Sequence, residues 1–267
     1  IYHQLNKPNL AIDQMLNAYK MDSLNADILN ELVNLFLNMG EKVKASNYNN
    51  ILIKNFPLEP RGFINSALIF LENENPRSAI TSLAPVISKF ENNYTANYLL
   101  GISYYQLEDY LNAESYLIKA LTIFPNSRSV KHNLALIYDV TRKWTQSDEI
   151  YIDLISTDST DAQAFNNYAY SLVERDQDYD LALELAKISI SLKPNSAPYL
   201  DTIGWIYFKL KDYENAIKYI KKSLAIDSKS NVIKEHFDAV IKARSEKVFK
   251  KNIQQAVIQD SSKILSP

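Results

Sequence analysis

The sequence predicts an all-α protein, a right-handed solenoid of stacked helical hairpins. Between Tyr94 and Ser127, apolar residues recur at i, i+3, i+4 and i+7 in two runs that flank the polar pair Glu108-Asp109. This spacing is typical of two amphipathic helices joined by a tight turn. The same pattern returns about every 34 residues along the chain, and such a fixed period is typical of solenoids. We therefore expect one continuous core rather than separate domains.

The composition is that of an ordinary folded chain and excludes several kinds of site. The 267 residues are 46% hydrophobic and 22% charged, which is enough apolar material for a core. The net charge of −2 gives no reason to expect binding to nucleic acid or to an anionic membrane. Without cysteine, disulfides and thiolate metal sites are excluded. The four glycines are too scattered for a phosphate-binding loop, and no apolar run is as long as a membrane span.

The repeat register follows from placing Gly101 at the eighth position of a 34-residue unit. Six complete units result: 26–59, 60–93, 94–127, 128–161, 162–196 and 197–230. The unit 162–196 has one extra residue, which we expect in its turn between Arg175 and Asp180, because a loop absorbs an insertion more easily than a packed helix does. Small residues recur where the second helix must approach the first most closely: Ala11, Ala45, Ala79, Ala113, Ser147, Ala182 and Ala216.

The two ends and one proline depart from this register. Residues 1–25 match the end of a first helix plus a full second helix, so they form a partial unit. Residues 231–260 read as a degenerate repeat that acts as a capping helix, and residues 261–267 as a disordered tail. Pro85 falls inside an expected helix, which it should kink or shorten because it lacks an N–H.

The unit length, the small residues at the helix contacts and the closing Pro125 together resemble a tetratricopeptide repeat (TPR). The segments Asn166-Asn167-Tyr168-Ala169-Tyr170 and Tyr199-Leu200-Asp201-Thr202-Ile203-Gly204-Trp205 look like the last repeats of bacterial TPR proteins, many of which are exported or lipid-anchored. The resemblance implies that the first helices line a concave groove for peptides or partner proteins. Carried over position by position, it implies these groove residues: Asn30, Asn34, Tyr98, Tyr105, His132, Asn166, Tyr170, Asp201 and Trp205.

Each aromatic residue of this set has two interpretations that the sequence leaves open. Tyr and Trp offer apolar area with a polar tip, which suits a contact surface. Periodic aromatics are equally often packed against neighbouring repeats. One TPR subgroup grips a C-terminal carboxylate with Lys and Asn. Asn30 and Asn34 lie where that pattern starts, but no lysine accompanies them at its usual place, so we do not expect that ligand.

No catalytic site, metal site or cofactor is expected. His3, His132 and His236 are far apart and make no metal-binding spacing, so we interpret His132 as a plain groove or surface histidine. The acidic residues follow helix surfaces and turns, with no indication of a pocket that would shift their pKa values. The basic run from Lys242 to Lys251 is interpreted as the solvated face of the capping helix rather than a phosphate-binding patch.

These observations predict a non-catalytic scaffold or adaptor that binds peptide segments or partner proteins in the concave groove. Two alternatives stay open. In the first, the chain is an accessory or regulatory region of a larger enzyme or of a secretion or envelope assembly. In the second, it is a module that self-associates through its terminal helices. The compartment is not determined: a bacterial cytoplasm, or a cell envelope or periplasm if an upstream signal was removed.

Overall fold

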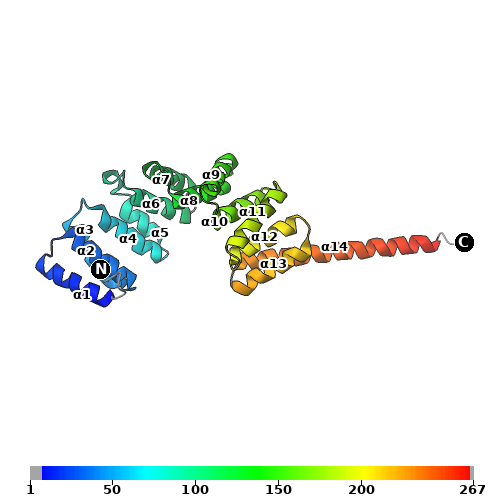
Figure 1. The fold of residues 1–267 in the computed structure, drawn as a ribbon, viewed down its shortest axis with the longest axis horizontal. Coiled ribbons are helices and arrows are strands. Elements are labelled where there is room, and N and C mark those ends of the chain that lie inside the picture. The colour runs from blue at the N-terminus through cyan, green and yellow to red at the C-terminus, as the bar shows by residue number, and fades with distance from the viewer. Residues whose placement is uncertain (1–7, 265–267) are drawn as a thin grey trace. The chain divides into compact units, whose positions relative to one another are not determined.

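The computed structural model describes residues 8–264 and the side chains of residues 9–250, and every regular element in that part of the chain is a helix (Figure 1). The predicted all-α class is therefore confirmed. The chain divides into two compact units, Ile1–Lys143 and Trp144–Pro267, and each is described by itself. The expectation of a single continuous core stays a prediction.

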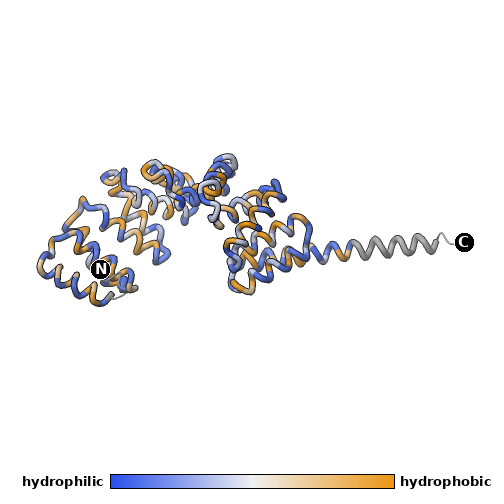
Figure 2. The backbone as a smooth tube through the Cα atoms, in the orientation of Figure 1, coloured by the Kyte–Doolittle hydropathy of each residue, from blue (hydrophilic) through white to orange (hydrophobic). Residues whose placement is uncertain are grey.

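The helices of each unit follow the repeat register. The first unit contains α1 (Pro8–Met21), α2 (Ala26–Asn38), α3 (Lys42–Asn55), α4 (Pro60–Glu72), α5 (Pro76–Leu83), the short 3-10 helix η1 (Ile87–Lys89), α6 (Tyr94–Gln106), α7 (Tyr110–Ile123) and α8 (Arg128–Val140). The second contains α9 (Trp144–Thr157), α10 (Ala162–Glu174), α11 (Tyr179–Leu192), α12 (Ala197–Lys209), α13 (Tyr213–Ile226) and α14 (Asn231–Ile264). The helices coloured by hydropathy in Figure 2 carry both hydrophobic and hydrophilic residues, as expected of helices that bury one face.

Short polar side chains start many of the helices. Asn93 Oδ1 accepts a hydrogen bond from the Ala96 N–H at 2.9 Å, and Asp161 caps α10 in the same way through Ala164. These caps satisfy backbone donors that the first turn of a helix leaves free. The following residues cap other helices by the same kind of contact: Asn25, Asn75, Asp109, Ser127, Asp178 and Asp212.

A left-handed backbone residue reverses the chain between successive helices. Glu108, with φ of 59°, lies in the turn between α6 and α7, and Gly40, with φ of 74°, lies between α2 and α3. This conformation ends a helix sharply, but it is unfavourable for residues with a Cβ. The other residues with positive φ are Glu74, Arg142, Asp176, Asp178 and Lys211.

Small residues set the spacing inside the hairpins. Ala113 of α7 is fully buried, and a Cβ added to Gly101 of α6 would lie only 2.6 Å from Leu117 Cγ. There is thus no room for a larger side chain where α6 and α7 meet. Five equivalent small residues of other second helices are buried as well, whereas Ala11 of α1 is half-buried: the five are Ala45, Ala79, Ser147, Ala182 and Ala216.

Two local irregularities lie where the sequence places them. Helix α5 ends at Leu83, two residues before Pro85, and the chain continues as η1, so the predicted shortening is confirmed. The turn between α10 and α11 spans residues 175–178, whereas the turn between α6 and α7 spans only 107–109. The extra residue therefore lies in the turn, as predicted.

The two ends differ in how far they follow the sequence prediction. Helix α1 lies where the second helix of the partial unit is expected, and the expected first-helix fragment in residues 1–7 lies outside the described residues. At the other end α14 continues to Ile264, so the expected tail is helical from residue 261 to 264, and residues 265–267 lie outside the described residues. No glycine or proline interrupts the sequence of α14, so no residue in it forces an earlier end.

Candidate protein-binding surface

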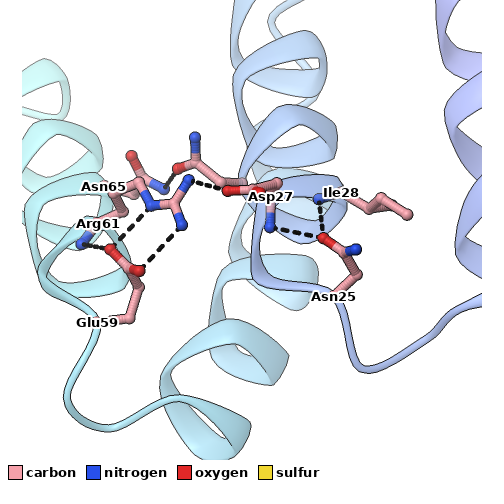
Figure 3. A network of polar contacts seen from close by, with 7 residues as sticks. Asn25, Asp27, Ile28, Glu59, Arg61 and Asn65 are labelled. Carbon is pink, nitrogen blue, oxygen red and sulfur yellow. Dashed lines mark hydrogen bonds and ion pairs between the residues drawn. The ribbon is translucent and has the colours of Figure 1, made fainter.

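The first helices of the first unit carry what we call the N-terminal face: Asp27, Asn30 and Asn34 of α2, Arg61 and Asn65 of α4, Tyr98 and Tyr105 of α6, and His132 of α8. Figure 3 shows a polar network that joins α2 to α4 on this face. Asn65 Nδ2 donates to Asn30 Oδ1 at 3.0 Å, and the Arg61 guanidinium bonds to Asp27 Oδ1 at 2.7 Å. The network fixes these side chains in position.

Arg61 also holds a second carboxylate. Its Nε and Nη2 atoms donate to the two carboxylate oxygens of Glu59 at 2.8 and 2.9 Å. These hydrogen bonds lower the pKa of Glu59, although its partial burial acts in the opposite direction. The cation is therefore shared by two acids, and Arg61 offers little free positive charge to a ligand.

The two tyrosines of the N-terminal face are half-buried. Tyr98 stacks in parallel on Tyr94, with ring centroids 6.0 Å apart, and Tyr105 lies 6.1 Å from Tyr110. Burial raises the pKa of both hydroxyls. Each ring packs against another tyrosine of the first compact unit, so part of each side chain stabilises the fold.

Among the residues expected in the groove, His132 is placed differently from its prediction as a plain groove or surface histidine. It is only 8% exposed on α8. Asn166 and Asp201, at 6% each, are buried as deeply, and side chains at this depth offer little area to a ligand unless neighbouring side chains move. Asn30 and Asn34, in contrast, are half-buried on α2 and keep part of their surface open.

In the second unit we call six residues the C-terminal face: Asn166, Tyr170 and Glu174 of α10, Asp201 and Trp205 of α12, and His236 of α14. Asp201 Oδ2 lies 2.7 Å from His236 Nδ1, and the Trp205 ring stacks on His236 with centroids 4.1 Å apart. The Trp205 indole N–H donates to Glu174 Oε1 at 2.8 Å. One connected cluster therefore links three helices.

Tyr170 is the most exposed predicted aromatic of this face, at 36%. Its pKa is raised to about 12, first by burial of the hydroxyl and then by the carboxylates of Glu174 and Asp201. The hydroxyl therefore stays protonated at any physiological pH and acts as a neutral hydrogen-bonding group.

His236 is the member that sequence reasoning did not place on this face. In the register of the last unit, Glu235 occupies the fifth position, equivalent to Asp201, and His236 follows one step later. Position-by-position transfer therefore passes over it. The signal that could have found it is its separation of 35 residues from Asp201, the same as that between Asn30 and Asn65.

Neither face has the composition of a metal centre. Among the residues that the structure describes, no group of three or more His, Asp or Glu side chains could hold a metal ion. In the same part of the chain, no helix is both long and apolar enough to cross a membrane. The chemistry on offer is hydrogen bonding, aromatic contact and charge.

Comparison with known proteins finds tetratricopeptide repeats in two stretches of the chain and gives its fold. The tetratricopeptide repeat family matches residues 64–128 and residues 197–230. A solved tetratricopeptide repeat protein from Parabacteroides merdae has a TM-score of 0.69 at 18% identity, covering 90% of this chain and 94% of that one. The structure of PilF from Pseudomonas aeruginosa has a TM-score of 0.66 at 18% identity, covering 80% of this chain and 96% of that one. The predicted fold class, a solenoid of stacked helical hairpins, is confirmed.

Two curated relatives match over part of their length. The type IV pilus assembly protein PilF of Pseudomonas aeruginosa is 28% identical over 149 residues, which is 54% of this chain and 58% of PilF. The human protein O-mannosyl-transferase TMTC3 is 23% identical over 242 residues, which is 89% of this chain. The chain spans only 26% of the length of TMTC3.

Proposed function

Because the chain is a tetratricopeptide repeat protein, we propose that it is a non-catalytic adaptor that binds partner proteins or peptide segments along the faces of its first helices. The repeat family supports a role in protein–protein interaction. Both the use of the first-helix faces and the absence of catalysis are part of the proposal.

One observation carries the proposal: side chains of neighbouring first helices are held in place by contacts from the fifth position of one repeat to the sixth position of the next. Asn30 bonds to Asn65, and Asp201 bonds to His236, each across 35 residues. Amide and carboxylate groups held in this way lose little further entropy when a peptide binds. Asn30, which keeps part of its surface open, presents an amide group that suits an extended peptide backbone.

Exposed aromatic area is the second requirement of a contact surface, and Tyr170 supplies it on the C-terminal face. On the N-terminal face the open parts of Tyr98 and Tyr105 contribute in the same way. We therefore propose that both faces take part, each through aromatic contacts flanked by amide groups.

The test is a pull-down from the source cell with wild type and with the variant Tyr105→Ala/Tyr170→Ala. Tyr116→Ala, a half-buried tyrosine on the second helix α7, is the matched control. We expect a set of partners that wild type and Tyr116→Ala capture and that the double variant loses, while circular dichroism shows that all three keep their helicity. Capture of the same partners by all three proteins would exclude these faces as the binding surface.

A second candidate is an accessory region of a larger enzyme or envelope assembly. The observation that favours it is that the curated relatives, one named for pilus assembly and one for O-mannosyl transfer, match this chain over only part of their own length. The intact mass of the native polypeptide, isolated from the source cell with an antibody against this chain, tests the candidate. A native mass equal to the 30.6 kDa of this chain would exclude a larger polypeptide.

A further inference from the structure

The C-terminal face has more hydrogen-bond acceptors than donors. Asn166 Oδ1 and Asp201 Oδ1 are both buried, and neither has a hydrogen-bond partner among the described residues. The remaining Asp201 oxygen is taken by His236, and the Asn166 amide nitrogen donates to Asn167 at 3.3 Å. Buried acceptors of this kind are normally satisfied by water or by a ligand, because leaving them unpaired is unfavourable.

The charge of this face is negative. Glu174 and Asp201 contribute carboxylates. Lys209 brings a cation, because its Nζ lies 5.8 Å from the centre of the Trp205 ring, and this cation is paired with Asp176 of the neighbouring turn at 2.9 Å. Glu174 is exposed, and one of its oxygens accepts from the Trp205 indole. Glu174 follows Tyr170 by four residues on α10, so its carboxylate lies on the same side of the helix as the exposed ring.

We propose that the C-terminal face binds an arginine side chain of the partner segment, with the guanidinium over the Tyr170 ring and against the Glu174 carboxylate. This inference rests on the proposed function, since it names the chemistry that the same face recognises. Guanidinium is a planar group of several donors that pairs with carboxylates and stacks on aromatic rings. Its remaining N–H groups are donors for the unpaired oxygens of Asn166 and Asp201, which they reach through a bridging water or after the side chains that cover those oxygens move.

The same arrangement disfavours an acidic ligand. A carboxylate has no donor for the two unpaired oxygens, and it would lie beside Glu174 and Asp201. Like charges in a partly desolvated site repel strongly. Selection by this face is therefore opposite to that of TPR sites that hold a C-terminal carboxylate.

The test uses three fluorescent pools of short peptides with random flanking residues and a fixed central residue: arginine, its neutral isostere citrulline, or glutamate. Binding to the full chain is followed by fluorescence anisotropy. We expect the arginine pool to bind about tenfold more tightly than the citrulline pool, from one ion pair plus one cation–π contact. The glutamate pool should bind most weakly.

Variants of the full chain test whether the charge of Glu174 causes the preference for arginine. Glu174→Gln should remove most of the preference for arginine over citrulline, whereas Glu184→Gln on α11, also exposed, should keep it. Tyr170→Phe should keep the preference, because it retains the ring, and Tyr170→Ala should weaken binding of every pool that binds.

The outcomes distinguish the arginine preference from the proposed function on which it rests. If the three pools bind equally well and Tyr170→Ala weakens that binding, the arginine preference is overturned and the proposed function stands. Binding that Tyr170→Ala does not change would overturn the proposed function at this face. Failure of all three pools to bind would overturn both.

Discussion

Asp201 Oδ2 lies 2.7 Å from His236 Nδ1, so one part-buried hydrogen bond ties α12 to the capping helix α14. Trp205 covers the imidazole from α12, with its ring at 14° to that of His236. The last helix is thus held by a polar contact as well as by the buried Ile233 and Val240. The C-terminal face depends on α14 for this reason.

Replacing His236 with alanine should destabilise the second unit. The change leaves the buried Asp201 carboxylate without its imidazole partner and removes the stack on Trp205, so we expect a loss of about 1–3 kcal/mol. Urea unfolding followed by Trp205 fluorescence, in a Trp144→Phe background, measures it. Lys234→Ala, an exposed position on the same helix, is the control. Unchanged unfolding of His236→Ala would show that the contact contributes nothing to stability.

The hairpin contact at Ala113 predicts overpacking on substitution. Ala113→Leu places three extra carbons where α7 approaches α6, in a position with no exposed surface, and should cost about 1–3 kcal/mol. Ser115→Leu adds a similar side chain to an exposed site of the same helix and should leave the melting temperature nearly unchanged. Thermal melting of the two variants compares them. Equal melting curves would refute a tight contact at Ala113.

Substitutions at Gly40 test the backbone strain of the turn without adding a steric clash. Its φ is 74°, and a Cβ added there would meet nothing within 4 Å. Gly40→Ala should therefore cost about 1 kcal/mol from backbone conformation alone. Gly40→Asn should cost less, because asparagine tolerates this region. Chemical denaturation ranks the three proteins, and an alanine variant as stable as wild type would contradict the argument.

The Glu59–Arg61 pair predicts a loss of stability in acid. Hydrogen bonds from Arg61 lower the pKa of Glu59 from its ordinary value of 4.5, so the folded state holds the carboxylate charged. The stability from this pair is fully present above that ordinary value and is lost as the pH falls through the lowered folded-state pKa. The stability difference between wild type and Glu59→Gln should thus be constant near neutral pH and shrink below about 4.5.

Urea midpoints of both proteins between neutral and acid pH measure that difference. Glu91→Gln, an exposed residue just after η1, shows how much of any effect is general. A gap between wild type and Glu59→Gln that widens as the pH falls would reverse the sign and rule out the pair as its source.

Tyr170 reports the negative charge of the C-terminal face. Its pKa of about 12 has burial as the main cause, with Glu174 and Asp201 adding to it. Glu174→Gln should lower this pKa while leaving it above the ordinary value of 10, because the hydroxyl stays buried. NMR titration of ¹³C-labelled tyrosine measures the change. An unchanged Tyr170 pKa in the variant would mean that Glu174 does not act on this hydroxyl.

The sequence by itself determined the repeat architecture. Apolar spacing and small residues such as Gly101 and Ala113 recur at one period because every hairpin repeats the same close contact. Pro85 and the extra residue after Glu174 could also be located, since a missing N–H and an insertion act locally. The end of α14 was missed because a polar sequence without helix breakers fits either a helix or a tail.

Only the tertiary structure decided which side chains of the candidate surface are open and which partners they have. His132 and Tyr170 are both predicted groove residues, yet the first is buried and the second exposed, because burial depends on neighbours from other repeats. His236 joined the C-terminal face through Asp201 and Trp205, residues on another helix. Periodicity assigns a residue to a face of its own helix, whereas hydrogen-bond partners and exposure come from contacts between helices, which a one-dimensional pattern does not contain.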